Sequence, residues 1–157
     1  MPAHRSEIGN QKSEIILSHS ADETIELGRK LAARMRSPML VLLRGDLGAG
    51  KTTMVKGIAE TFDAASQENV TSPTFTLIHE YRGPDVSLYH IDLYRIETER
   101  ELATLGLDEI LSDPQNVVLI EWGERFPRLV RERDMEIAIE RTAEDERKIT
   151  VTEGSGA

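Results

Sequence analysis

Four residues in the first third of the chain, Gly45, Gly50, Lys51 and Thr52, match the spacing G-x-x-x-x-G-K-[ST]. An apolar run at 41–43 precedes them and a helical pattern follows, which is the strand, loop and helix order of a phosphate-binding P-loop. A glycine-rich turn that merely exposes a lysine is the alternative. The flanking pattern favours the P-loop, so we expect a nucleoside triphosphate site here.

The residue types in this loop suit phosphate chemistry. Gly48 and Gly50 carry no Cβ, so the backbone can approach an anion and turn successive N–H groups toward it. The helix that begins near Lys51 adds the positive end of its dipole. Lys51 would reach the β- and γ-phosphates, and the Thr52 hydroxyl would ligate Mg²⁺.

A P-loop enzyme also needs a carboxylate for Mg²⁺ and a group that positions the attacking water. Asp92 and Glu121 each end an apolar strand pattern, and both could serve. The unbroken apolar run at 117–120 makes Glu121 the better Walker B residue, because it predicts a central strand beside the P-loop strand. An acid at a strand end that simply faces solvent is the alternative for both.

Other candidates have ordinary structural explanations as well. His90 shares a strand face with Asp92 and could polarise water, but a histidine in a strand is more often structural. Trp122 could stack on a base or a partner, or be a core aromatic. The arginines at 125–133 could bind phosphate or an acidic partner, although a solvated helix face is the simpler reading. The segment at 71–74 is predicted to be an extended connection because of Pro73, and its other three residues each carry a hydroxyl.

Hydrophobic periodicity supplies the elements that must position these residues. It predicts strands over residues 14–18, 39–44, 74–81, 86–94, 116–122, 135–139 and 148–151, and helices over residues 21–36, 51–62, 98–105 and 108–111. Ser20 with Glu23, and Thr98 with Glu101, have capping-box spacing. A turn at 82–85 predicts a hairpin, and the last two strands are expected to be antiparallel. The pattern predicts an α/β fold.

Composition limits the partners and the metal chemistry. The 157 residues predict one domain over 14–153, after a disordered tail at 1–13 and before a frayed end at 154–157. A net charge of −9 makes unaided binding to nucleic acid unfavourable. The chain has no cysteine, so oxygen ligands and Mg²⁺ are expected. No apolar run is long enough to span a bilayer, and we expect a cytoplasmic protein with no membrane contact.

Four segments together resemble a known family. They are residues 46–53 (DLGAGKTT), 72–77 (SPTFTL), 90–95 (HIDLYR) and 120–122 (IEW), in that order. This set closely resembles the TsaE (YjeE) family, bacterial P-loop ATPases needed for the N6-threonylcarbamoyladenosine (t6A) modification of tRNA. The resemblance runs from about residue 20 to residue 152. It implies a P-loop NTPase-like three-layer sandwich with a mixed, mainly parallel central sheet and antiparallel edge strands.

The resemblance also implies roles for individual residues. Lys51, Asp92 and Glu121 are implied as catalytic, with Thr52 and Glu121 as ligands of Mg²⁺. The segment at 72–74 is implied to be switch-like and to face the γ-phosphate. Contacts with ATP are implied for Thr24, Gly48, Ala49, Gly50, Lys51, Thr52, Thr53, Trp122 and Arg147.

The family context implies partners for the chain. These are a threonylcarbamoyl transferase (TsaD-like) and its companion subunit (TsaB-like), whose assembly ATP hydrolysis would regulate or reset, with tRNA bound only through them. Activity alone is expected to be low, because no self-supplied arginine finger is evident. A small-molecule P-loop kinase, with residues 125–133 as a lid, is the alternative. A GTP switch is disfavoured because no Asn-Lys-x-Asp segment is present.

Overall fold

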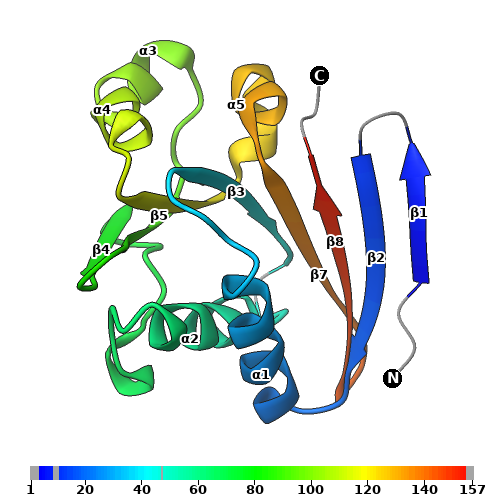
Figure 1. The fold of residues 1–157 in the computed structure, drawn as a ribbon. Coiled ribbons are helices and arrows are strands. Elements are labelled where there is room, and N and C mark those ends of the chain that lie inside the picture. Colours follow the sequence, from blue (N-terminus) through cyan, green and yellow to red (C-terminus); the bar gives the residue numbers. More distant parts are fainter. Residues whose placement is uncertain (1–3, 9–10, 47, 155–157) are drawn as a thin grey trace.

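The computed structural model describes residues 4–8, 11–46 and 48–154, which form one eight-stranded sheet with helices on both faces (Figure 1). The strands are β1 (His4–Ile8), β2 (Gln11–Ser18), β3 (Met39–Arg44), β4 (Ile78–Arg82), β5 (Ser87–Asp92), β6 (Asn116–Glu121), β7 (Met135–Ala143) and β8 (Glu146–Glu153). Their order in the sheet is β1-β2-β8-β7-β3-β6-β5-β4.

The sheet is parallel at its centre and antiparallel at both sides. Neighbours among β7, β3, β6 and β5 run parallel, whereas β4, β8, β2 and β1 pair antiparallel with their neighbours. The predicted hairpin at 82–85 and the antiparallel closing strands are confirmed. The sheet was expected to be mainly parallel, but its parallel part is limited to the strands from β7 to β5. The other strands are joined by hairpin connections, which link only antiparallel strands.

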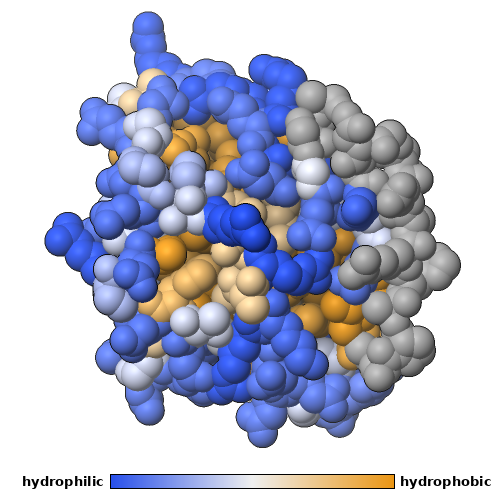
Figure 2. Space-filling view, in the orientation of Figure 1, coloured by the Kyte–Doolittle hydropathy of each residue, from blue (hydrophilic) through white to orange (hydrophobic). Residues whose placement is uncertain are grey.

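The helices make the outer two layers. They are α1 (Ala21–Ala32), α2 (Lys51–Thr61), α3 (Glu99–Ala103), α4 (Leu107–Ser112) and α5 (Pro127–Glu132), with short 3₁₀ turns at Gln67–Asn69 and Gly123–Arg125. Figure 1 shows α1 and α2 on one face of the sheet and α3, α4 and α5 on the other. The surface in this view is mainly hydrophilic, and apolar residues are visible in the recesses between the layers (Figure 2).

The central strands β3 and β6 are buried on both faces. Val41 and Leu43 of β3 belong to the core cluster beneath α1 and α2, and Leu40 and Leu42 to the cluster on the opposite face. All six residues of β6 are buried. β6 pairs directly with β3, which confirms the predicted central strand beside the glycine-rich loop.

Two predictions near the N-terminus are corrected. Residues 4–8 and 11–13, expected in a disordered tail, lie in β1 and β2, because β2 pairs with β8 through backbone groups far away in sequence. The helix predicted to reach residue 36 ends at Ala32, because the N–H groups of residues 34 and 35 donate to carbonyls three residues back instead of four. Of the predicted frayed end, residues 155–157 lie outside the described residues.

The predicted N-caps Ser20 and Thr98 are present, but the glutamate of each capping box accepts the backbone N–H of the residue before the cap, not that of the cap itself. Ser20 Oγ accepts the Glu23 N–H at 3.0 Å, and the Glu23 carboxylate accepts the His19 N–H at 2.8 Å. Thr98 caps α3 in the same way. No helix within the described ranges is both long and apolar enough to cross a membrane.

Helices α1 and α2 touch backbone to backbone where two glycines face each other. A Cβ on Gly28 would lie 2.3 Å from the Met54 carbonyl oxygen, and one on Gly57 would lie 2.0 Å from the Ile25 carbonyl oxygen. Real Cβ atoms do not approach so closely, so the helices would have to separate. This close contact sets the position of α2 beneath the sheet and hence of the loop that precedes it.

Gly57→Ala is therefore expected to lower the free energy of unfolding by about 1–3 kcal/mol through overpacking. In an uncrowded helix the same change would stabilise the protein by up to about 1 kcal/mol, so the sign of the effect separates the two explanations. Urea unfolding of the variant measures it, with Lys30→Ala on the exposed surface of α1 as the control. A stabilised Gly57→Ala variant would contradict the close approach.

Candidate functional site

The glycine-rich loop connects the end of β3 to the start of α2. Gly48 has φ +81° and Gly50 has φ +116°. Residues other than glycine rarely adopt this left-handed backbone conformation. Ala49 between them is buried. The first N–H groups of α2 have no acceptor within the helix, and they carry the positive end of its dipole. The loop therefore forms a backbone cradle suited to an anion.

Lys51, the first residue of α2, is directed into the interior of the site. Its Nζ lies 3.0 Å from Glu121 Oε1 and also donates to the Gly45 carbonyl oxygen. The two side chains are only 12% and 5% exposed. The lysine predicted to bind phosphate and the acid predicted to bind metal thus form a nearly buried ion pair.

The register of the parallel strands brings the two predicted carboxylates together. Glu121 at the end of β6 is opposite Leu43 on β3 and opposite Asp92 on β5. These residues lie at the carboxyl ends of neighbouring parallel strands, where ligands bind in open α/β sheets. The expectation that both acids serve one site is consistent with this placement.

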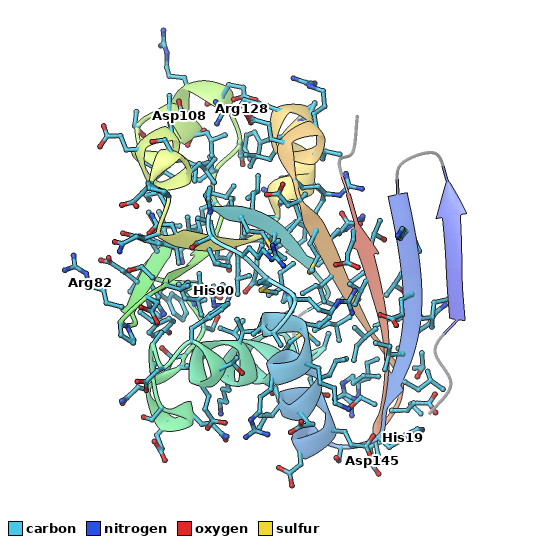
Figure 3. All side chains as sticks on the ribbon, viewed as in Figure 1. His19, Arg82, His90, Asp108, Arg128 and Asp145 are labelled. Carbon is cyan, nitrogen blue, oxygen red and sulfur yellow. The ribbon has the colours of Figure 1, made fainter. Side chains whose placement is uncertain are left out.

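Glu121 is held on its other oxygen by His90. His90 Nε2 lies 2.6 Å from Glu121 Oε2, and the imidazole is fully buried between the sheet and the layer of α1 and α2 (Figure 3). Burial acts to raise the pKa of Glu121, but the hydrogen bond and charge of His90, together with Lys51, outweigh it and lower this pKa below its ordinary value. Glu121 is therefore ionised at neutral pH.

Asp92 is buried and joins the 72–77 segment to the sheet. Its Oδ2 accepts from Thr74 Oγ1 at 3.2 Å and its Oδ1 from the Tyr94 N–H at 2.9 Å, while Thr74 Oγ1 also contacts Ser72 Oγ at 2.8 Å. Residues 74–77 were predicted as strand, but they form a turn with Leu77 at φ +71°. The turn lets the Thr74 hydroxyl reach Asp92, 18 residues away in the chain, a contact that the strand prediction did not include.

Trp122 lies at the mouth of the site in a stack of three side chains. It has φ +65°, and its ring lies 5.2 Å from that of Tyr94. The Arg125 guanidinium lies 4.6 Å from the Trp122 ring and donates to the Tyr94 carbonyl oxygen at 2.6 Å. Trp122 is half-buried and lines a cavity, so it is not simply a core aromatic. From the sequence, Arg125 was considered only as one of the arginines at 125–133, although its position three residues after Trp122 could have indicated its place beside that residue.

Most predicted residues line one cavity of about 540 Å³. Its walls are formed by Gly48, Gly50, Lys51, Thr52, Thr53, Ser72, Thr74, Asp92, Tyr94, Glu121 and Trp122. The side chains combine one cation, two carboxylates and several hydroxyls with two aromatic rings. That set matches what a phosphorylated ligand with a divalent cation requires.

Thr24 and Arg147 lie instead in a smaller hollow of about 250 Å³ on another side of the loop, which Gly50 and Thr53 also line. Thr24 Oγ1 lies 2.7 Å from Ser18 Oγ. Arg147 Nε donates to the Ala49 carbonyl oxygen at 2.8 Å, so β8 supports the loop directly. The loop therefore separates two groups of predicted nucleotide contacts.

The arginines at 125–133 do not form one surface. Arg128 pairs with Asp108 at 3.0 Å (Figure 3), and the buried Arg133 donates to the Val130 carbonyl oxygen at 2.9 Å. Arg125, by contrast, contacts Tyr94 and Trp122, which line the 540 Å³ cavity.

The described residues include no cluster of three or more His, Asp or Glu side chains that could hold a metal ion by themselves. Mg²⁺ is usually bound through one or two carboxylates, substrate phosphates and water, without an all-protein cage. The Glu121 carboxylate and the Thr52 hydroxyl, which line the same cavity, fit that pattern.

Comparison with known proteins identifies the family. The model of the family "Threonylcarbamoyl adenosine biosynthesis protein TsaE" matches residues 18–149. The chain belongs to the TsaE family. The TsaE of Bacillus subtilis is 42% identical over 83% of this chain and 80% of its own length, and that of Rickettsia bellii is 36% identical over 89% and 94%.

A solved structure agrees with this TsaE assignment. The crystal structure of Bacillus subtilis YdiB superposes with a TM-score of 0.73 at 36% identity, covering 94% of this chain and 88% of that one. The family resemblance inferred from the four motifs is thereby confirmed. Membership in TsaE places the chain in a family named for t6A biosynthesis.

The lowered pKa of Glu121 predicts how stability changes with pH. Because this pKa is lower in the folded than in the unfolded state, ionised Glu121 stabilises the fold above the ordinary glutamate value of about 4.3, and the contribution is lost as pH falls through the lowered value. The unfolding free energy of the wild type minus that of Glu121→Gln should therefore fall on acidification.

Denaturant unfolding between about pH 3 and pH 7 measures this difference. The buried variant Asn116→Leu removes a hydrogen bond to the Ile110 carbonyl oxygen but no charge, so its difference from wild type should not vary with pH. A Glu121→Gln difference that grows on acidification would contradict the lowered pKa.

Proposed function

We propose that this TsaE-family chain is a Mg²⁺-dependent ATPase of the P-loop NTPase fold. The observation that carries the proposal is the ion pair between Lys51 and Glu121, set in a cavity bounded by a glycine loop and the first turn of α2. This is the combination of phosphate cradle, lysine and carboxylate that phosphoryl transfer uses.

The loop at 48–53 would bind the phosphates through backbone N–H groups. The β- and γ-phosphates would offer Lys51 acceptors in place of Glu121 and the Gly45 carbonyl. Arg147 supports the loop from behind by binding the Ala49 carbonyl oxygen. Thr24 and Arg147 border the smaller hollow and would contact another part of the nucleotide.

Thr52 and Glu121 would hold Mg²⁺, which when bound neutralises charge on the phosphate oxygens. Asp92 would orient the attacking water, because its carboxylate lies in the same cavity and on the strand next to Glu121. The water oxygen would bond to the γ-phosphorus as the bond to the β,γ-bridging oxygen breaks, giving ADP and phosphate. Thr74, bonded to Asp92, would couple the 72–77 segment to this step.

We further propose that turnover is low without partners, a TsaD-like transferase and a TsaB-like companion, and that hydrolysis regulates or resets their assembly. Arg125, the arginine beside the cavity mouth, is engaged by Tyr94 and Trp122, so it is not poised as an arginine finger. The net charge of −9 fits a subunit that meets tRNA only through its partners.

Two of the arginines at 125–133 do not fit the lid that the alternative, a small-molecule kinase, would need. A lid would need them to face the cavity, whereas Arg128 and Arg133 are bound to Asp108 and Val130. We therefore retain the ATPase as the single proposed function.

Hydrolysis assayed with and without the transferase complex tests this proposal. Lys51→Ala should reduce stimulated turnover by about 10²–10³-fold, through loss of charge stabilisation. Asp92→Asn should reduce it by about 10²–10⁴-fold, and Glu121→Gln by about 10–100-fold at limiting Mg²⁺.

The exposed Arg82 on β4, whose side chain pairs with Glu80, provides the control Arg82→Ala, which should keep wild-type turnover. Stimulated turnover that survives all three site substitutions would falsify the mechanism. High activity without any partner would refute the regulatory part alone.

Arg147 gives a separate prediction about the loop. Arg147→Ala removes the donor to the Ala49 carbonyl, so the loop should be less well ordered and ATP binding weaker, by about 1–2 kcal/mol or roughly 5–30-fold in Kd. Equilibrium dialysis with labelled ATP measures this, with Lys148→Ala on the same strand as the comparison. Unchanged affinity in Arg147→Ala would show that the loop does not depend on β8.

A further inference from the structure

His90 lies on β5 and its imidazole is fully buried. From the sequence, a structural role for this residue was favoured over a catalytic one. Its Nε2 is bonded to Glu121 Oε2 at 2.6 Å. Its Nδ1 is buried and has no hydrogen-bond partner among the described residues. Since an ionised carboxylate only accepts hydrogen bonds, the hydrogen of this contact belongs to Nε2.

A buried imidazole with an unpartnered nitrogen is a poor choice for stability alone. An orphaned buried polar atom destabilises a fold by about 1–3 kcal/mol, whereas an apolar side chain of similar size would not. Leu88, two residues earlier on the same face of β5, is such a residue and is fully buried in the core cluster. The polarity of His90 is therefore explained by its contact with Glu121.

The two oxygens of Glu121 have different partners. Oε2 is bonded to His90, which is wholly enclosed, and Oε1 is bonded to Lys51, which lines the cavity. Asp92, the neighbouring acid, is bonded to Thr74 and Tyr94. His90 thus acts on one defined oxygen of one carboxylate.

We propose that His90 is the positioning residue for Glu121, an inference that rests on the proposed Mg²⁺-ATPase function. By holding Oε2 inside the protein, His90 fixes the carboxylate so that Oε1 is the oxygen presented to the cavity. When phosphates engage Lys51, Oε1 becomes available to the divalent cation without a change in the side-chain rotamer. His90 does not touch nucleotide or metal itself.

Binding, without turnover, provides the test. Retention of labelled ATP is measured by equilibrium dialysis over a series of Mg²⁺ concentrations, and also in EDTA. In His90→Leu the Mg²⁺ concentration at the midpoint should rise by about 10–100-fold, the usual effect of losing a hydrogen bond to a metal ligand, while ATP binding in EDTA stays within about twofold of wild type.

Rescue by a conservative variant separates positioning from packing. The glutamine amide nitrogen occupies the ε position of the histidine Nε2, whereas the asparagine amide is one bond shorter. His90→Gln should therefore return the midpoint to within about threefold of wild type, and His90→Asn should resemble His90→Leu. If His90→Leu does not fold, the Gln and Asn pair carries the same comparison.

The buried control Asn116→Leu, at the opposite end of β6, should lose stability but keep the wild-type Mg²⁺ midpoint. A wild-type midpoint in His90→Leu or His90→Asn, or a midpoint in His90→Gln as high as theirs, would overturn the inference. So would an equal loss of ATP binding in EDTA. If the wild type itself binds no ATP at any Mg²⁺ concentration, the proposed function fails and this inference falls with it.

Discussion

An ionised carboxylate that is 5% exposed needs partners that replace its lost hydration, and the candidate site depends on how Glu121 meets this need. Lys51 compensates its charge on one oxygen and His90 donates to the other. Removing one member of such a pair would leave an uncompensated charge in the interior. The lysine that would bind phosphate and the acid that would bind metal therefore stabilise each other.

Sheet topology makes this arrangement available. β6 lies between β3 and β5 with all three parallel, so the loop after β3, Glu121 and Asp92 converge at one edge. The close contact of Gly28 and Gly57 sets α2 against α1, and so determines the position of Lys51 at the start of α2. Backbone packing in one layer thereby controls charge pairing at the sheet.

The antiparallel strands also contribute to the site. β8 supplies Arg147, whose guanidinium holds the Ala49 carbonyl of the loop, and the β4–β5 hairpin brings Asp92 to the 72–77 segment. Trp122 follows β6, and its left-handed backbone conformation turns the chain so that Arg125 stacks on its ring. The cavity is thus bounded by both the parallel core and its antiparallel flanks.

The sequence by itself determined the loop, the central strands, the helix caps and the family, because each depends on local spacing: glycines before Lys51, apolar runs before Glu121, and a hydroxyl three residues before an acid. It also placed His90 and Asp92 on one face of a strand through simple alternation. It did not reveal that His90 bonds Glu121, that Arg125 lies over the Tyr94 ring or that residues 12 and 13 pair with β8. Those contacts link elements distant in the chain, and strand register and side-chain packing, which only the tertiary structure decides, bring them within bonding distance.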